Sequence, residues 1–393
     1  MKQPKIRLKG FEGEWETSRL DTCVDFLDNL RKPIEEKRRI KGIYPYYGAS
    51  GIVDFVNDYI FAEELILLSE DGANITDRNY PVCFLAKGKY WVNNHAHVLK
   101  ARDGFVNSFV CNAMERKDYT QYNTGMAMPK LNKEVCKRIP LTHPTTEEQQ
   151  AIASYFQHLD SLIQSTTKKI ESLKQVKLAS LQSMFPQEGE TTPRVRFKGF
   201  EGEWEKVPLK KFAKRVTRKN KNMESTLALT ISSIDGLVSQ IDYFNNLVVG
   251  ANLANYFLLK KGEFAYNKSY SKGYPFGSVK RLEKYDQGIL STLYIVFSIN
   301  NEISSDYLTH FFDTTLWHKQ VAERAEEGAR NHGLLNIGAD DFMSIDVIAP
   351  HSYAEQQAIA SYFTSLDAQI TYQSQRLEKL KQIKSACLDN MFV

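Results

Sequence analysis

One nine-residue stretch occurs twice and divides the chain into two copies of one unit. Glu148-Gln-Gln-Ala-Ile-Ala-Ser-Tyr-Phe156 returns unchanged at 355–363, and this offset of 207 residues holds without a gap to the Met-Phe pairs at 184–185 and 391–392. A leader at 6–16 likewise returns at 195–205, at an offset of 189 residues, with the shared motif Gly-Phe-Glu-Gly-Glu-Trp. The segments between these repeats show no comparable match. Because internal repeats set the organisation of a chain, we predict one repeated frame that carries two different inserts.

The duplicated stretch predicts a long helix in each copy. Apolar or small residues recur at alternating steps of four and three, which is the spacing of a left-handed coiled coil. Polar residues interrupt this seam at Thr166, Lys177, Gln373 and Lys384, and we expect them to fix its register. The apolar seam comprises Ile152, Phe156, Leu159, Ile163, Ile170 and Leu173 in the first copy and Ile359, Phe363, Leu366, Ile370, Leu377 and Leu380 in the second.

Both helices have start signals, and the first has a stop. Thr145-x-x-Glu148 and Ser352-x-x-Glu355 are capping boxes, and Pro186 ends the first helix. A helix over 146–185 is roughly 60 Å long at about 1.5 Å per residue. Its seam needs a partner, and the nearest is its own copy, packed parallel or antiparallel. We expect the antiparallel coiled coil, which gives a pseudo-twofold axis; two amphipathic helices packed on separate domains are the alternative.

Length and composition indicate a multidomain globular protein. At 393 residues and 42% hydrophobic content, two to three domains are expected. The five cysteines are scattered without a CxxC pair, so neither a disulfide framework nor a zinc site is indicated. The N-terminus lacks the apolar core of a signal peptide, and we expect a cytoplasmic protein. The net charge of +4 permits nucleic-acid binding without requiring it.

The predicted fold class is α+β, with two mixed α/β domains separated by the two long helices. The boundaries are 1–143 for the first domain, 144–186 for the first helix, 187–350 for the second domain and 351–393 for the second helix. Apolar runs predict strands at 60–68, 80–86, 90–99, 227–232, 262–266 and 293–299, and helices at 306–312 and 317–326.

The sequence contains no catalytic constellation that withstands scrutiny. The segment 273–280 lacks the Gly-Lys-Ser/Thr ending of a phosphate-binding loop. Glu35-Glu-Lys37 matches the end of a nuclease motif, but Glu-x-Lys occurs too often to carry weight. His95-x-His97 would place two imidazoles on one strand face, yet no third metal ligand lies nearby in sequence. A polar or DNA-facing strand surface is the preferred interpretation of this pair, and no metal is predicted.

What remains is a set of side chains suited to reading nucleic acid. Base edges and phosphates are read by Arg, Lys, Asn, Gln and Ser, while aromatic rings stack or pack on sugars. Each residue alone has an ordinary alternative as a solvated loop residue or a structural tyrosine. The DNA-binding candidates in the first insert are Tyr44, Tyr46, Tyr47, Ser50, Asn93, Asn94, His95, His97, Arg102 and Lys130; those in the second are Asn267, Lys268, Ser269, Tyr270, Lys272, Arg330, Asn331 and His332.

The order of these parts resembles the specificity subunit of type I restriction–modification systems. The duplicated Glu-Gln-Gln-x-Ile-Ala helix, the Gly-Phe-x-Gly-x-Trp leaders and the segments 46–51 and 262–267 carry the resemblance, which covers essentially the whole chain. It implies a non-catalytic subunit in which each insert is a target-recognition domain for one half of an asymmetric, bipartite site in double-stranded DNA. The helices would then set the spacer.

The resemblance also implies partners. Two methyltransferase subunits would dock on the helices, and restriction–translocase subunits would join them. S-adenosylmethionine, ATP and Mg would be bound by those partners, with no cofactor on this chain and no membrane association. Two alternatives stay open at the level of sequence: a protein-interaction scaffold in which the helices are the function, and a nuclease or methyltransferase with an unrecognised site.

Overall fold

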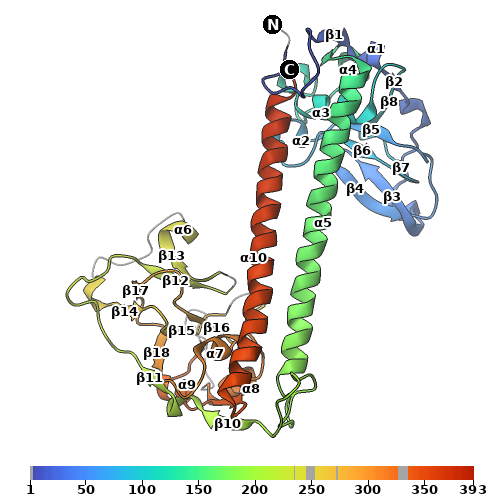
Figure 1. The fold of residues 1–393 in the computed structure, drawn as a ribbon. Coiled ribbons are helices and arrows are strands. Elements are labelled where there is room, and N and C mark those ends of the chain that lie inside the picture. The colour runs from blue at the N-terminus through green and yellow to red at the C-terminus, as the bar shows by residue number, and fades with distance from the viewer. Residues whose placement is uncertain (1–2, 234, 245–252, 271–272, 326–334) are drawn as a thin grey trace. The chain divides into compact units, whose positions relative to one another are not determined.

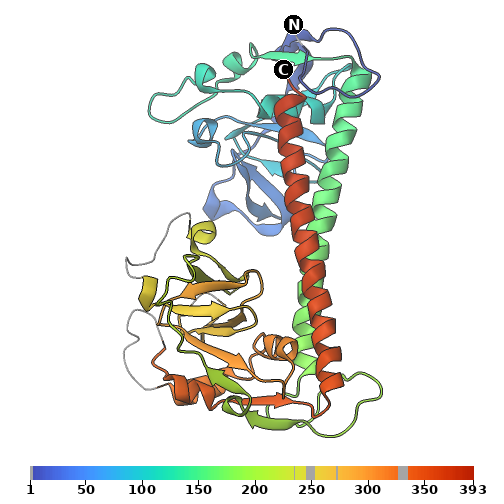
Figure 2. The same ribbon diagram turned by 60° about the vertical axis from the view of Figure 1, so that its left-hand side comes forward.

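The chain folds into two compact units. The computed structural model describes residues 3–233, 235–244, 253–270, 273–325 and 335–393. The first unit comprises Met1–Lys168 with Ser374–Val393, and the second comprises Lys169–Gln373. The expected α+β character is present in both units (Figures 1 and 2). Each long helix contributes residues to both units.

Three antiparallel or mixed sheets build the first unit. A four-stranded antiparallel sheet has the order β2-β8-β5-β6, a three-stranded sheet has the order β4-β3-β7 with β3 and β7 parallel, and β1 pairs with β9. The strands are β1 Glu16–Arg19, β2 Val24–Phe26, β3 Lys41–Gly48, β4 Gly51–Val56, β5 Leu65–Ser69, β6 Cys83–Ala86, β7 Trp91–Val92, β8 Ala96–Ala101 and β9 Pro140–His143. The helices before α5 are α1 Leu20–Cys23, α2 Asn74–Asp77, α3 Asn107–Glu115 and α4 Lys133–Cys136.

The central strand β5 is buried on both faces, which is why its sequence is continuously apolar. Ile66 and Leu68 belong to the core that contains residues of α3, whereas Leu65 and Leu67 belong to the core beneath the three-stranded sheet. Strands were predicted at 60–68 and 80–86; β5 overlaps the first of these and ends one residue beyond it, and β6 lies within the second. The single strand predicted at 90–99 is wrong, because Asn93–His95 separate β7 from β8.

The second unit contains a different arrangement of strands. A four-stranded antiparallel sheet has the order β11-β18-β15-β16, and three two-stranded sheets pair β10 with β19, β12 with β13 and β14 with β17. The strands are β10 Glu205–Pro208, β11 Ala213–Arg215, β12 Leu229–Ser232, β13 Gly236–Ser239, β14 Phe257–Lys260, β15 Phe264–Asn267, β16 Ser278–Arg281, β17 Gln287–Leu290, β18 Ile295–Ile299 and β19 Asp346–Ala349. Short helices are α6 Gln240–Phe244, α7 Ser305–Phe311, α8 His318–Arg324 and α9 Ala339–Met343. The predicted strands and helices of this insert are present with shifted ends.

Both long helices are present: α5 spans Thr146–Met184 and α10 spans Tyr353–Asn390. The hydroxyl halves of the predicted capping boxes form, since the Glu148 amide donates to Thr145 Oγ1 at 3.5 Å and the Glu355 amide to Ser352 Oγ at 3.3 Å. None of the helices within the described ranges combines the length and apolar character needed to cross a membrane.

Inside each unit, α5 and α10 pack antiparallel through contacts that mirror one another. In the first unit the Tyr155 hydroxyl lies 3.3 Å from Cys387 Sγ, and in the second the Tyr362 hydroxyl lies 2.9 Å from Ser180 Oγ. Tyr362 is the repeat copy of Tyr155, and Cys387 is that of Ser180, each at the offset of 207. The duplicated sequence therefore makes duplicated contacts in reverse order.

The duplicated leaders bind the first turn of the helices. Arg7 places Nε and Nη2 on the two carboxylate oxygens of Glu148 at 2.8 and 2.7 Å, and Arg196 binds Glu355 in the same way at 2.7 and 2.8 Å. Arg7 also donates to the Gly13 carbonyl, at a backbone φ of +89° that favours glycine. The carboxylates expected to complete the capping boxes thus bind leader arginines instead.

Candidate nucleic-acid interface

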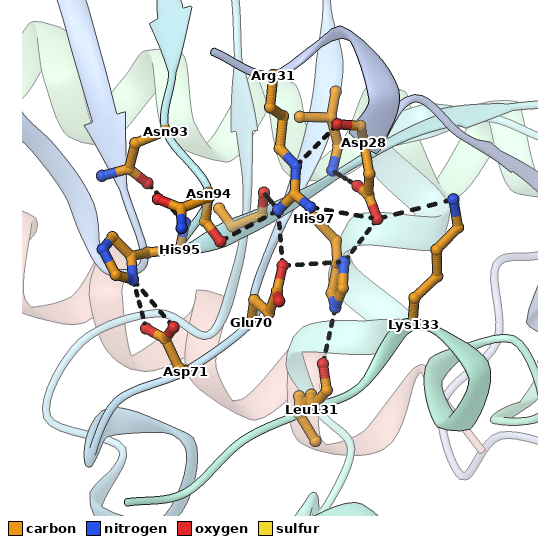
Figure 3. Close-up of polar contacts among 12 residues, drawn as sticks. Asp28, Arg31, Glu70, Asp71, Asn93, Asn94, His95, His97, Leu131 and Lys133 are labelled. Atoms are coloured by element: carbon orange, nitrogen blue, oxygen red, sulfur yellow. Dashed lines mark hydrogen bonds and ion pairs between the residues drawn. The ribbon is translucent and has the colours of Figure 1, made fainter. Parts of the chain in front are cut away.

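The loop between β7 and β8 presents two of the predicted reading side chains at the surface. Asn94 and His95 are exposed, whereas Asn93 is buried and shapes the loop (Figure 3). The Asn93 side-chain oxygen accepts from the His95 backbone amide at 2.8 Å, and the Asn93 backbone amide donates to the Tyr47 carbonyl at 3.0 Å. His95 Nδ1 lies 2.9 Å from both carboxylate oxygens of Asp71. Asp71 therefore fixes the orientation of the His95 ring.

Arg31 supports this loop from below. Its Nη1 donates to Glu70 Oε2 at 2.7 Å, to the Ala96 carbonyl at 2.8 Å and to the Asn94 carbonyl at 3.3 Å. The guanidinium thus ties the two ends of the exposed loop to Glu70, the residue before Asp71. Sequence reasoning missed Arg31 and Asp71 as parts of the site. The signal available was the acidic pair at 70–71, which directly follows a buried strand.

His97 is a buried cation and no reader of bases. Its Nδ1 lies 2.9 Å from Asp28 Oδ2 and its Nε2 lies 2.8 Å from the Leu131 carbonyl (Figure 3). Because both partner atoms accept hydrogen bonds, each ring nitrogen donates and the imidazole carries a positive charge. Burial lowers the pKa of His97, but the neighbouring Asp28 and Cys136 together outweigh it and raise the pKa to about 10. The pair joins the strand β8 to the loop that follows β2.

The remaining candidates of the first insert divide between structural and exposed positions. Tyr46 is buried, and its hydroxyl contacts both the amide and the carbonyl of Ile34, so its place in the structure is that of a packing residue. Tyr44 and Tyr47 are half-buried against other aromatic rings. Ser50 is exposed in the turn between β3 and β4.

Two cations of the predicted set have acidic partners. Lys130 Nζ lies 3.6 Å from Glu70, which brings Lys130 to the group beneath the β7–β8 loop. Arg102 pairs with Asp25 at 2.9 Å, on the strand pair β2–β8. Lys130 therefore joins the loop of Asn94 and His95, whereas among the described residues no contact links Arg102 to that loop.

The described candidates of the second insert lie at the end of strand β15 and directly after it. The Asn267 side-chain oxygen accepts from the Ser269 amide at 3.0 Å, and Lys268 Nζ donates to the Ile337 carbonyl at 3.3 Å. Partial burial lowers the pKa of Lys268. Tyr270 is exposed. Lys272, Arg330, Asn331 and His332 lie outside the described residues.

A cluster of charges in the second unit joins both long helices to the insert. Lys177 of α5 lies 2.9 Å from Asp313 and 2.8 Å from Asp367 of α10, and Lys280 of β16 lies 3.0 Å from Asp313. His310, Asp313 and Asp367 have metal-ligand spacing. The two ammonium groups already neutralise the two carboxylates, so this geometry is that of an ion-pair network.

The Lys177 pair has a counterpart in the first unit. Lys384 and Asp160 pair there, and each is the repeat copy of a member of the Lys177–Asp367 pair, at the offset of 207. The two lysines that interrupt the predicted seam therefore bind acids on the opposite helix in both units. Among the contacts of the described residues, Lys384 has no second, buried acidic partner of the kind that Asp313 is for Lys177.

Comparison with family models decides the membership of the chain. The model of the type I restriction modification DNA specificity domain matches twice, at residues 12–175 and 201–382. The chain belongs to this family. Each copy of the specificity domain takes in one insert and most of the long helix that follows it, so the sequence duplication and the family match divide the chain in the same way.

Individual relatives match parts of this specificity protein. A protein named type I restriction enzyme specificity subunit S.HindORF215P, of Haemophilus influenzae, is 33% identical over 155 residues, which are 39% of this chain and 39% of that protein. Type I restriction enzyme MjaVIII specificity subunit, of Methanocaldococcus jannaschii, is 24% identical over 212 residues, or 50% of this chain and 48% of that protein. The matches thus span less than half the length of these relatives.

A solved structure shares the fold. The crystal structure of the type I restriction–modification system S subunit from M. genitalium superposes with a TM-score of 0.66 at 14% sequence identity. The alignment covers 100% of this chain and 99% of that one. The likeness at this identity concerns the arrangement of the backbone.

Proposed function

We propose that this chain is the non-catalytic DNA-recognition subunit of a type I restriction–modification complex. The observation that carries the proposal is the presence of two specificity domains with divergent inserts on one duplicated helix frame. A duplicated frame offers the same kind of docking surface twice, whereas divergent inserts suit different ligands. A chain of this kind reads two different DNA half-sites and recruits the same protein twice.

Each insert reads one half of an asymmetric, bipartite site in double-stranded DNA. In the first insert, Asn94, His95 and Ser50 offer exposed hydrogen-bonding groups, and Arg31 holds the loop of Asn94 and His95 in place. An asparagine amide matches the N6 and N7 edge of adenine, and a serine hydroxyl accommodates any base. In the second insert, the described candidates are Asn267, Lys268, Ser269 and Tyr270, of which Tyr270 is exposed.

The two long helices form an antiparallel coiled coil that sets the spacer between the half-sites. Support comes from the reciprocal contacts inside each unit: Tyr155 with Cys387 repeats as Tyr362 with Ser180. Such reciprocity is what a pseudo-twofold axis produces. The same frame docks two methyltransferase subunits, to which restriction–translocase subunits add. S-adenosylmethionine, ATP and Mg belong to those partners, and the complex acts in the cytoplasm.

An exchange of inserts tests this function. Residues 206–350 are replaced by the corresponding insert of another family member, and the altered chain is co-expressed with its methyltransferase. The methylated sequence should change in one half-site only, while the other half-site and the spacer stay as they were. The matched control replaces residues 17–143 and should change the opposite half-site. A change in both half-sites after either exchange would refute independent reading.

A further inference from the structure

The ribbon formed by β3 and β4 exposes apolar side chains to solvent. Ile43 is 79% exposed in β3, and Ile52, Val53 and Phe55 are 49%, 57% and 48% exposed in β4. Soluble proteins rarely expose contiguous apolar surface without a binding role. None of the reading groups described above accounts for these four residues, so the ribbon needs a separate explanation.

The position of β4 makes its exposed apolar side chains more unusual. The strand lies at the edge of the three-stranded sheet, with β3 as its hydrogen-bonded neighbour (Figure 1). An exposed apolar edge strand invites aggregation, and proteins usually protect such edges with charges or cover them. The pairing of β3 with β4 contains a β-bulge: Tyr46 pairs with Asp54 and Tyr47 with Ile52, which leaves Val53 as an extra residue. The bulge limits pairing with another strand while Ile52, Val53 and Phe55 stay accessible.

The surroundings of the ribbon fit DNA better than a protein partner. Lys41 is exposed at the start of β3 and Lys37 shortly before it, while Arg38 pairs with the exposed Glu35 at 3.3 Å. Lysine is depleted at the centres of protein interfaces, whereas it neutralises phosphates beside a DNA groove. The turn of the ribbon also adjoins the reading loop, since the Ala49 carbonyl accepts from Ser69 Oγ at 2.5 Å and the Tyr47 carbonyl accepts from the Asn93 amide at 3.0 Å.

We propose that the β3–β4 ribbon enters the major groove of the first half-site and that Ile52 and Phe55 contact the C5-methyl groups of thymine. The proposal rests on the function proposed above. The major groove admits a two-stranded ribbon, and an apolar side chain distinguishes thymine by its methyl group, which the other three bases lack. The polar β7–β8 loop and the apolar ribbon then read different features of one half-site.

Replacing thymine by uracil tests the proposal directly, because uracil pairs identically and lacks only the methyl group. The complex of this chain with its methyltransferase subunits is titrated with duplexes that carry the mapped target. Uracil replaces thymine at one position at a time, first in the half-site assigned to residues 17–143 by insert exchange and then in the other. Loss of a methyl contact should weaken binding about fourfold, the equivalent of about 0.8 kcal/mol.

The variant Ile52→Ser/Phe55→Ser should bind thymine and uracil duplexes equally in the first half-site. Its reading of the second half-site should match that of the unaltered chain, which verifies that the complex is intact. Met126→Ser removes a fully exposed apolar side chain elsewhere in the same unit and should keep the response to uracil.

Three results would overturn the proposal: equal binding of thymine and uracil duplexes by the unaltered chain, an undiminished response in the double variant, or a first half-site without an A·T pair. Selective binding to both half-sites would persist in each of these cases. Loss of all sequence selectivity in the unaltered complex would instead refute the proposed function itself.

Discussion

The ion-pair network around Lys177 allows a quantitative comparison between the two copies of the frame. We consider Lys177→Met, which keeps the length of the side chain and removes its charge. Lys384→Met is the matched control, because Lys384 is the repeat copy of Lys177 on the other helix. The sequence context is duplicated, so a difference between the two variants reports the surroundings of the charge.

The structure predicts that Lys177→Met lowers stability more than Lys384→Met does. Lys177 and Asp313 are each less than one-fifth exposed, and burial of Asp313 is offset by Lys280 and Lys177, which together hold the pKa of Asp313 well below its usual range. Removing one partner of a buried ion pair costs about 3–5 kcal/mol, and we expect about 3 kcal/mol because Lys280 remains. Lys384 and Asp160 are 30% and 56% exposed, and an exposed pair contributes about 0–1 kcal/mol.

Hydrogen–deuterium exchange measures the two costs in the same protein. Peptides from 353–373 report the second unit, and peptides from 374–390 report the first. A loss of about 3 kcal/mol accelerates exchange in 353–373 roughly 100-fold in Lys177→Met. Lys384→Met should change exchange in 374–390 by no more than about fivefold. Equal effects in the two variants, or a change below about fivefold in Lys177→Met, would refute this reasoning.

Two further predictions concern buried charges. In the folded chain His97 keeps a proton that the unfolded chain releases above its ordinary pKa of 6.5. The first unit should therefore lose about 1.4 kcal/mol of stability per pH unit between pH 6.5 and pH 10. His97→Gln should abolish this slope in thermal unfolding measured across that range. Arg196→Met leaves the buried Glu355 without its guanidinium and should destabilise the second unit by about 3 kcal/mol in urea unfolding, whereas Arg194→Met breaks an exposed pair and should cost less than about 1 kcal/mol; similar midpoints for the two variants would contradict the structural role of Arg196.

The two long helices and the most apolar strands were predictable because their signals are local. Heptad spacing and hydroxyl caps identify α5 and α10, and continuous apolar runs identify buried strands such as β5. The strand predicted at 90–99 failed where Asn93 turns the chain through its own side-chain hydrogen bond. A single asparagine in a mostly apolar run does not reveal such a turn from the sequence.

The sequence predicted which residues belong to the candidate site, but not which of them are exposed to solvent. Asn94 and His95 lie at the surface as a reading role requires, whereas Tyr46, Asn93 and His97 are buried. Their partners come from distant parts of the chain: His97 binds Asp28, 69 residues away. Pairings over such distances depend on how the sheets pack, which local patterns do not encode. The leader arginines could have been found, because both copies of the leader retain them.

In the function that we propose, this chain gives a methyltransferase its DNA specificity. The most direct measurement is to co-express the chain with the methyltransferase encoded beside it and to map modified adenines across the host genome. We expect a split, asymmetric methylation motif that disappears when the chain is omitted. Methylation at the same sequence without the chain, or a soluble complex that methylates no defined motif, would contradict it.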